Sequence, residues 1–120
     1  MEYRNLGGYL ISNLCFGTAT FVRGKLKPEL DSSLGMGCFS KALNEGVNIV
    51  HSNPNLQTQW AVKEVLTSNS EKQVRHLIKV ELPIVGDIET LRDKFRKRVE
   101  YSLTNLGINF VEGVIYEVDL

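Results

Sequence analysis

The chain has 120 residues, 42% of them hydrophobic and 23% charged, which is the composition of one folded domain large enough to bury a core. Fourteen basic side chains balance fourteen acidic ones, so no overall charge favours nucleic acid or an anionic membrane as a partner. The N-terminus lacks the basic start and apolar core of a signal peptide, and no apolar run reaches the roughly 20 residues of a membrane span. We therefore expect a cytoplasmic protein.

The first third of the chain predicts a hairpin, a strand and a helix. Gly7 and Gly8 indicate the turn of a β-hairpin at about 2–13, and the apolar run 14–18 predicts the first strand of the main fold. Residues 31–33 can cap a helix whose apolar residues recur every four positions and which Gly46 can end. The expected buried positions of this helix are Leu34, Cys38 and Ala42.

The rest of the chain continues this alternation of strands and helices. Residues 47–50 predict a second strand, and a second helix follows with Trp60 as its core anchor and with Ala61, Val65 and Leu66 on the same face. Residues 77–80 predict a third strand, and 110–116 a fourth. Between them Gly86 and Asp87 precede the strongest helix pattern, which Gly107 ends. Its apolar stripe comprises Ile88, Leu91, Phe95, Val99, Leu103 and Leu106.

The order hairpin, β, α, β, α, β, α, β predicts an α/β fold with a right-handed parallel sheet. No repeat or linker divides the chain, so we treat 1–120 as a single domain.

Three segments carry a resemblance to one enzyme family. Residues 8–18 resemble the aldo-keto reductase pattern Gly-Leu-x-Val-Ser-x-Leu-x-Leu-Gly-Thr, and 98–112 resemble Ser-Val-Glu-x-Ser-Leu-x-x-Leu-Gly-x-Asp-Tyr-Ile-Asp. Residues 42–50 are similar to Ala-Leu-x-x-Gly-Val-Asn-Phe. The family fold is a (β/α)8 barrel of about 250 residues, so the resemblance implies the N-terminal half of such a barrel, preceded by the hairpin.

The resemblance also implies four catalytic positions, most of which have changed here. In the family an aspartate, a proton-donating tyrosine, a lysine that lowers the tyrosine pKa, and a histidine lie at the C-terminal ends of the early strands. Lys79 matches the lysine. His51 stands at the aspartate position, Leu56 at the tyrosine position and Glu117 at the histidine position. Leucine cannot donate a proton.

The resemblance implies NADPH as the cofactor of a completed barrel. Only Gly17 and Thr18 match positions near the nicotinamide, because the family holds the cofactor mostly with loops after the later strands. We therefore expect no cofactor on the isolated chain, and we expect no metal site, because no Cys/His cluster is present.

The leading interpretation is a non-catalytic aldo-keto reductase-like half-barrel, truncated or decayed. One alternative is an NADPH-dependent oxidoreductase completed by another chain, and another is a cytoplasmic regulatory or binding subunit. His51, Lys79 and Glu117 could also form a new site, with the imidazole as a general base. Scattered polar residues at a solvent-facing rim would give the same pattern.

Three further features bear on partners. Five cations lie within 92–98, but they flank Phe95 of the apolar stripe, so we interpret them as a solvated helix face rather than a nucleic-acid site. His76 is interpreted as structural or exposed. Cys15 and Cys38 lie in apolar contexts that indicate buried thiols in a reducing compartment. An unfinished barrel would leave strand edges open and expose inward residues such as Ile49 and Ile78, so we expect a homo-oligomer or a chain that completes the barrel.

Overall fold

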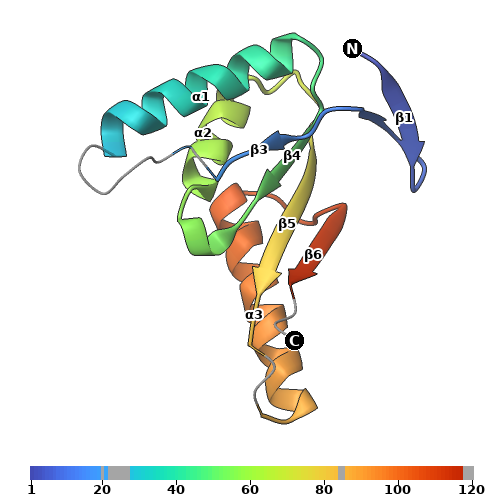
Figure 1. Ribbon diagram of the computed structural model, residues 1–120, viewed down its shortest axis with the longest axis vertical. Helices are drawn as coiled ribbons and strands as arrows, with labels where there is room; N and C mark the ends of the chain where they lie inside the picture. The colour runs from blue at the N-terminus through green and yellow to red at the C-terminus, as the bar shows by residue number, and fades with distance from the viewer. Residues whose placement is uncertain (20, 22–27, 84–85, 118–120) are drawn as a thin grey trace.

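A computed structural model describes residues 1–19, 21, 28–83 and 86–117, with side chains of 28–32 left aside. An antiparallel hairpin precedes a parallel sheet with strands in the order β3-β4-β5-β6, and the described α-helices lie along one side of that sheet (Figure 1). The predicted α/β fold, a hairpin followed by parallel βα units, is confirmed.

The strands are β1 (Tyr3–Leu6), β2 (Tyr9–Ser12), β3 (Phe16–Gly17), β4 (Ile49–Ser52), β5 (Arg75–Glu81) and β6 (Gly113–Glu117). The helices are α1 (Pro28–Asn44), the short 3-10 helix η1 (Pro54–Leu56), α2 (Gln59–Ser68) and α3 (Ile88–Leu106).

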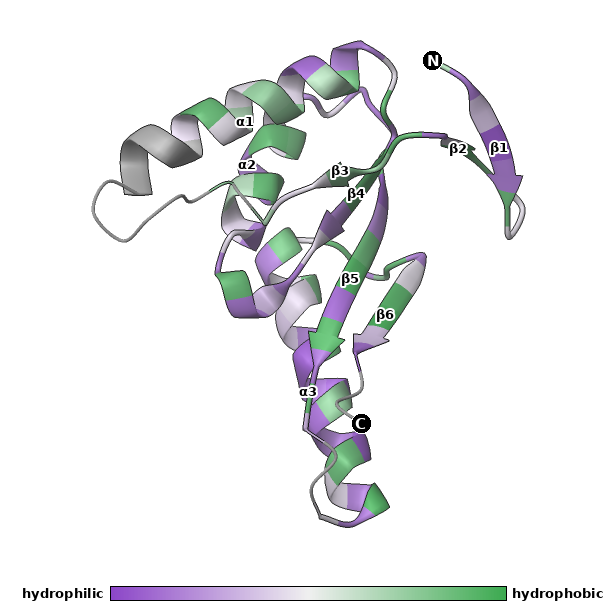
Figure 2. Cartoon of the chain, viewed as in Figure 1, coloured by the Kyte–Doolittle hydropathy of each residue, from purple (hydrophilic) through white to green (hydrophobic). Residues whose placement is uncertain are grey.

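Successive residues of strand β5 point to opposite faces of the sheet. Its residues alternate between buried and half-buried along the whole strand, and its last four residues also alternate between hydrophobic and hydrophilic (Figure 2). Ile78 and Val80 point into the core shared with the helices and are fully buried. Lys79 and Glu81 therefore lie on the opposite face, which we call the open face. Arg75 and Leu77 of β5 lie on the same face. The residues of the other strands that are in register with these four are Gly17, Ile49, His51, Gly113, Ile115 and Glu117.

This assignment corrects the expected exposure of two inward residues. Ile78 does not face the barrel interior, because the register of β5 turns it toward the helices. Ile49 is on the open face, yet it is also buried.

Helix α1 begins earlier and packs on a different face than the sequence predicts. It starts at Pro28, and proline suits a first helical position because it has no N–H to leave unpaired. Among its described side chains, Phe39 and Leu43 are buried, whereas Leu34 and Cys38 are exposed. Phe39 stacks on Phe16 of β3 with ring centroids 4.8 Å apart. Aromatic packing on β3 therefore sets the orientation of the helix, and the predicted stripe is wrong by one position. The predicted end at Gly46 is confirmed by its positive φ of 97°.

Helix α2 packs through small residues. Ala61, Val62 and Val65 face the core, but Trp60 is 49% exposed, so its predicted role as core anchor is wrong. The buried amide of Gln59 at the start of this helix donates to the hydroxyls of Ser52 and Ser102, each at 3.1 Å. This side chain joins β4, α2 and α3.

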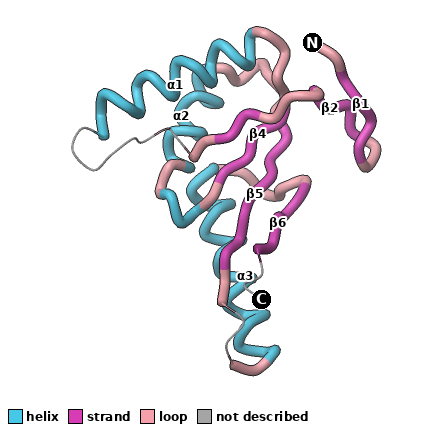
Figure 3. Tube along the Cα trace, viewed as in Figure 1, coloured by secondary structure: helices cyan, strands magenta, loops and turns pink. Residues whose placement is uncertain are grey.

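Helix α3 has the predicted ends. The Asp87 carboxylate accepts from the backbone N–H of Thr90 at 2.9 Å, and Gly107 ends the helix with a φ of 68°. The helix is longer than the sheet it packs against, so its first turns project beyond the end of β5 (Figure 3). Ile88 on that projecting part is 84% exposed, which removes it from the predicted buried stripe. Phe95 packs edge-on against Tyr116 of β6, with centroids 5.6 Å apart.

The hairpin is attached to the sheet through a few side chains. The Asn48 amide accepts from the backbone N–H of Ser12 and donates to the Leu10 carbonyl, at 2.8 and 2.9 Å. The Tyr3 hydroxyl donates to the Gly46 carbonyl, and the Arg75 guanidinium lies 4.3 Å from the centre of the Tyr9 ring.

Both cysteines have free thiols, and both residues are exposed, so the prediction of buried thiols is wrong. No helix among the described residues is long and apolar enough to cross a membrane.

Candidate functional site

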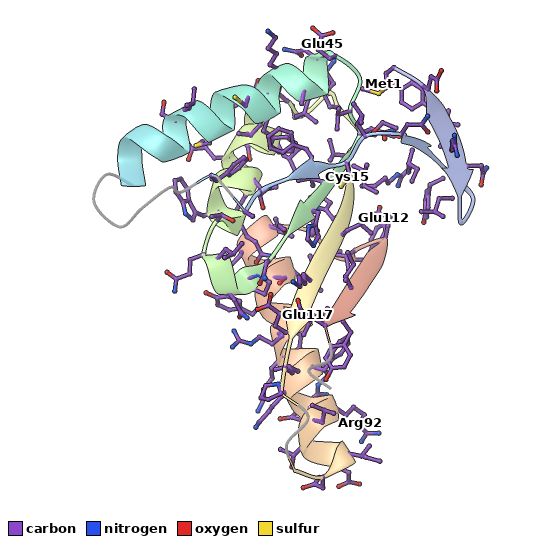
Figure 4. The ribbon with its side chains drawn as sticks, viewed as in Figure 1. Met1, Cys15, Glu45, Arg92, Glu112 and Glu117 are labelled. Carbon is purple, nitrogen blue, oxygen red and sulfur yellow. The ribbon has the colours of Figure 1, made fainter. Side chains whose placement is uncertain are left out.

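The C-terminal ends of neighbouring strands bring several polar side chains together on the open face. Lys79 and Glu81 come from the end of β5, Glu117 from the end of β6 and His51 from β4. Parallel strands end at the same edge of a sheet, so residues distant in sequence meet there. Figure 4 shows Glu117 at this edge, far from Glu112 at the other end of β6.

The Lys79 ammonium forms the centre of the group. It pairs with the carboxylate of Glu117 across the β5–β6 register and with that of Glu81 at 3.2 Å. The hydrogen bond to Glu117, followed by that to Glu81, raises the pKa of Lys79 above its ordinary value. The ammonium is therefore held in its protonated form. Two carboxylates face one cation, so this part of the edge carries a net negative charge.

Glu81 is fixed from its other side by two amides. Asn53 donates to one of its carboxylate oxygens at 2.8 Å, and Asn55 donates to the other at 3.2 Å. The hydrogen bond from Asn55, followed by that from Lys79, lowers the pKa of Glu81. The Asn53 side chain also caps η1 by accepting from the backbone N–H of Asn55 at 2.8 Å. The loop after β4 is thus tied to the end of β5.

His51 lies beside a pocket of about 180 Å³. Burial, followed by the positive charge of Lys79, lowers the pKa of this imidazole, which favours its neutral form. Its Nε2 atom is buried and has no hydrogen-bond partner among the described residues. The pocket is lined by Thr18, Ala19, His51, Asn53, Leu56, Lys79 and Glu81.

Leu56, the last residue of η1, contributes an apolar side chain to this pocket and is 44% exposed. The next residue, Gln57, has a φ of 54°, in the left-handed region that favours glycine. The backbone at Gln57 therefore adopts a conformation that is uncommon for a residue with a side chain.

Gly17 and Thr18 lie where β3 ends. Gly17 is exposed, and a Cβ atom built on it would meet nothing within 4 Å. Thr18 is buried, and its hydroxyl donates to the carbonyl of His51 at 3.1 Å. The threonine therefore links β3 to β4 at the pocket wall.

The structure brings all six sequence-predicted site residues to one edge of the sheet, although neither Gly17 nor Glu117 lines the pocket. Sequence reasoning missed Glu81, Asn53 and Asn55. Glu81 had a signal: it lies two residues after Lys79, and side chains two apart on a strand share a face. Within the described ranges no group of three or more His, Cys, Asp or Glu side chains could hold a metal ion.

Comparison with solved structures decides the wider fold. A protein from Pseudomonas aeruginosa assigned to the aldo-keto reductases matches with a TM-score of 0.72 and 26% identity, over 95% of this chain and 46% of that one. The chain is a partial aldo-keto reductase-like barrel. A thermostable aldo-keto reductase crystallised with the inhibitor epalrestat gives a TM-score of 0.75 at 17% identity, over 99% of this chain and 44% of that one. An aldo-keto reductase from Bacillus halodurans gives 0.71 at 16% identity, over 98% and 40%.

The aldo-keto reductase-like chain spans less than half the length of these matched structures. No protein-family model and no curated protein sequence matches it. The open face of its sheet therefore corresponds to the side that faces the interior of a complete barrel.

Proposed function

We propose that this chain is a non-catalytic aldo-keto reductase-like half-barrel that does not reduce carbonyl compounds. The observation that carries the proposal is the environment of Lys79, whose ammonium is bound by Glu81 and Glu117. In the family the lysine lowers the pKa of a tyrosine acid by offering its positive charge. Here two carboxylates neutralise that charge, and the position of the acid is taken by Leu56.

The polar groups at this edge do not replace the missing acid. A proton donor for a carbonyl must lose its proton at the moment of reaction, and its efficiency falls when its pKa lies far from the operating pH. The hydrogen bonds to Glu117 and Glu81 raise the pKa of Lys79, which makes the ammonium a poorer donor. Burial and the charge of Lys79 lower the pKa of His51, which favours the neutral imidazole, a much weaker acid than the imidazolium.

The described residues do not fit a dinucleotide cofactor. The pocket beside His51 has a volume of about 180 Å³, whereas sites for small molecules typically have volumes of about 300 to 1,000 Å³. The only cation in its lining is Lys79, which is already bound to carboxylates, so the described lining offers no free positive charge to a phosphate group. We accordingly derive no reaction step through NADPH, and we propose that the isolated chain binds none.

The proposal is tested by incubating the purified chain with NADPH and a panel of aldehydes, and by a fluorescence titration with NADPH alone. We expect oxidation no faster than in buffer and no saturable binding. The matched variant is Lys79→Met, which keeps the length of the side chain and removes its charge. If the natural chain oxidises NADPH when an aldehyde is present, and if Lys79→Met abolishes this activity, the proposal is overturned and the oxidoreductase alternative is supported. The variant also separates the chain's own activity from that of a contaminating reductase.

A further inference from the structure

The cationic segment of α3 lines a groove on the surface. The groove has about 510 Å³ and lies between the chain leaving β5, at Leu82 and Pro83, and the face of α3 that carries Lys94, Arg98 and Tyr101. These three residues stand at i, i+4 and i+7, so they project from one side of the helix. Lys97 completes the lining. The sequence alone indicated a solvated helix face here, because it could not show that the end of β5 forms a second wall.

The charges of this groove are only partly neutralised. Asp93 binds Lys97 at 2.8 Å and Arg96 at 3.0 Å, and Arg96 also approaches Glu100 at 3.9 Å. Lys94 and Arg98 form no ion pair with any described residue. Among the described residues, no acidic side chain lines the groove. Lys94 and Arg98 therefore face it as two positive charges that no ion pair with a described residue compensates.

The remaining lining is apolar and aromatic. Tyr101 is 48% exposed, and Leu82 and Pro83 form the opposite wall. Aromatic rings bind flat apolar groups by stacking, and guanidinium and ammonium groups bind phosphate oxygens through charge-assisted hydrogen bonds. The volume lies within the range of small-molecule sites.

We propose that this groove binds a small organic phosphate monoester whose ester group is an apolar ring. A phosphate monoester carries a charge of about −1.5 to −2 near neutral pH, which matches the two uncompensated cations better than a carboxylate with a single charge does. The phosphate lies against Lys94 and Arg98, and the ring lies against Tyr101. The proposal is independent of the absence of carbonyl reduction, because no residue of the groove belongs to the pocket beside His51.

The test uses phenyl phosphate as the probe and follows the backbone amide resonances of the full chain by NMR. Inorganic phosphate and phenol are titrated separately. We expect phenyl phosphate to shift amides of residues 94–101 with saturation and to bind at least about tenfold more tightly than either fragment, because it uses both parts of the groove. Arg98→Gln should weaken phenyl phosphate about tenfold, as expected for the loss of a charge-assisted hydrogen bond.

Two further variants separate a site from general charge attraction. Tyr101→Ala should weaken phenyl phosphate while leaving inorganic phosphate unchanged, because only the ring contact is lost. Arg92→Gln is the matched control, since Arg92 is a cation of the same helix that does not line the groove (Figure 4). Equal weakening by Arg92→Gln and Arg98→Gln would overturn the proposal, as would binding of phenyl phosphate no tighter than that of inorganic phosphate. The amide spectrum of each variant reports whether it is folded.

Discussion

The ammonium of Lys79 is bound by the carboxylate of Glu117 from the neighbouring strand. The two residues lie diagonally across the β5–β6 register, since Lys79 is opposite Ile115 and Glu117 is opposite Glu81. Under the proposed family resemblance, this ion pair joins the position of the family lysine to the position of the family histidine. The carboxylate of Glu117 therefore offsets the positive charge of Lys79.

Replacement of Glu117 by glutamine should lower the pKa of Lys79 toward its ordinary value. The hydrogen bond to Glu117 is the largest cause of the raised pKa, and Glu81 alone would remain. The measurement is an NMR titration of the Lys79 side chain. Glu100→Gln serves as the control, because Glu100 is an exposed carboxylate on α3 that pairs with Arg96. An unchanged titration of Lys79 in the Glu117 variant would show that the pair does not form in solution.

The two histidines should make the protein less stable as the pH falls below about 6.5. Burial lowers the pKa of His76, against the opposing charge of Glu112, and burial followed by Lys79 lowers that of His51. Each ordinary value is 6.5, so below it the unfolded chain binds protons that the folded chain does not, and unfolding is favoured. Urea unfolding at pH values between about 7 and 5 should show this loss of stability.

Substitution of the histidines should flatten this pH dependence. His76→Gln should remove part of the slope, and the double variant with His51→Gln should remove most of the rest. Glu81 and Asp87 have lowered pKa values, starting from ordinary values of 4.5 and 3.8, so their effects come at lower pH. A double variant with the same slope as the natural chain would contradict the assignment.

Two glycines of α1 should respond oppositely to alanine. A Cβ atom on Gly37 would meet nothing within 4 Å, so Gly37→Ala should stabilise the protein by about 0.5 to 1 kcal/mol through helix propensity. A Cβ atom on Gly35 would lie 2.8 Å from Cδ1 of Phe21, so Gly35→Ala should destabilise it by about 1 to 3 kcal/mol. Chemical denaturation of both variants measures the free energy of unfolding. The same sign for both would mean that the contact with Phe21 is absent in solution.

We propose that two copies of the chain pair through the open face and the outer edge of β6. Ile115 is 44% exposed on the open face, beside charges of both signs from Lys79 and Glu117, and Val114 is 37% exposed on the edge strand. One copy corresponds to 46% of the length of a matched barrel, so two copies supply the material of about one barrel. Sedimentation should give a dimer at micromolar concentration, and Ile115→Glu should dissociate it. A natural chain that sediments as a 13.5 kDa monomer would refute the pairing.

Local signals in the sequence predicted most of the fold. Helix α3 begins after Asp87 and ends at Gly107 as expected, because a capping carboxylate and a left-handed glycine act through nearby backbone groups. Burial was harder to predict. The orientation of α1 depends on the stacking of Phe39 on Phe16, which lies more than twenty residues before it in sequence, and the short β3 gives no pattern that reveals which face it covers.

Only part of the candidate site could be predicted, because the rest also depends on contacts between residues that are distant in sequence. The family resemblance pointed to Lys79, His51 and Glu117, but the ion pairs depend on the register between β5 and β6, which the sequence does not show. The hydrogen bonds from Asn53 and Asn55 to Glu81 depend on the path of the loop after β4. The wall that Leu82 and Pro83 place beside α3 likewise arises only when β5 and α3 are packed together.

The attachment of the hairpin by Asn48 affects the order in which the chain folds and opens. The strands of the hairpin are adjacent in sequence, so their mutual pairing is local, but their anchor to the sheet lies about forty residues away at the start of β4. We therefore expect the hairpin to dock only after β4 has taken its place. In the folded protein it should detach as one unit, because breaking the Asn48, Tyr3 and Tyr9 contacts leaves the β1–β2 hydrogen bonds untouched. Amide protons of the hairpin should then exchange through this opening, at a lower free energy than those of β5.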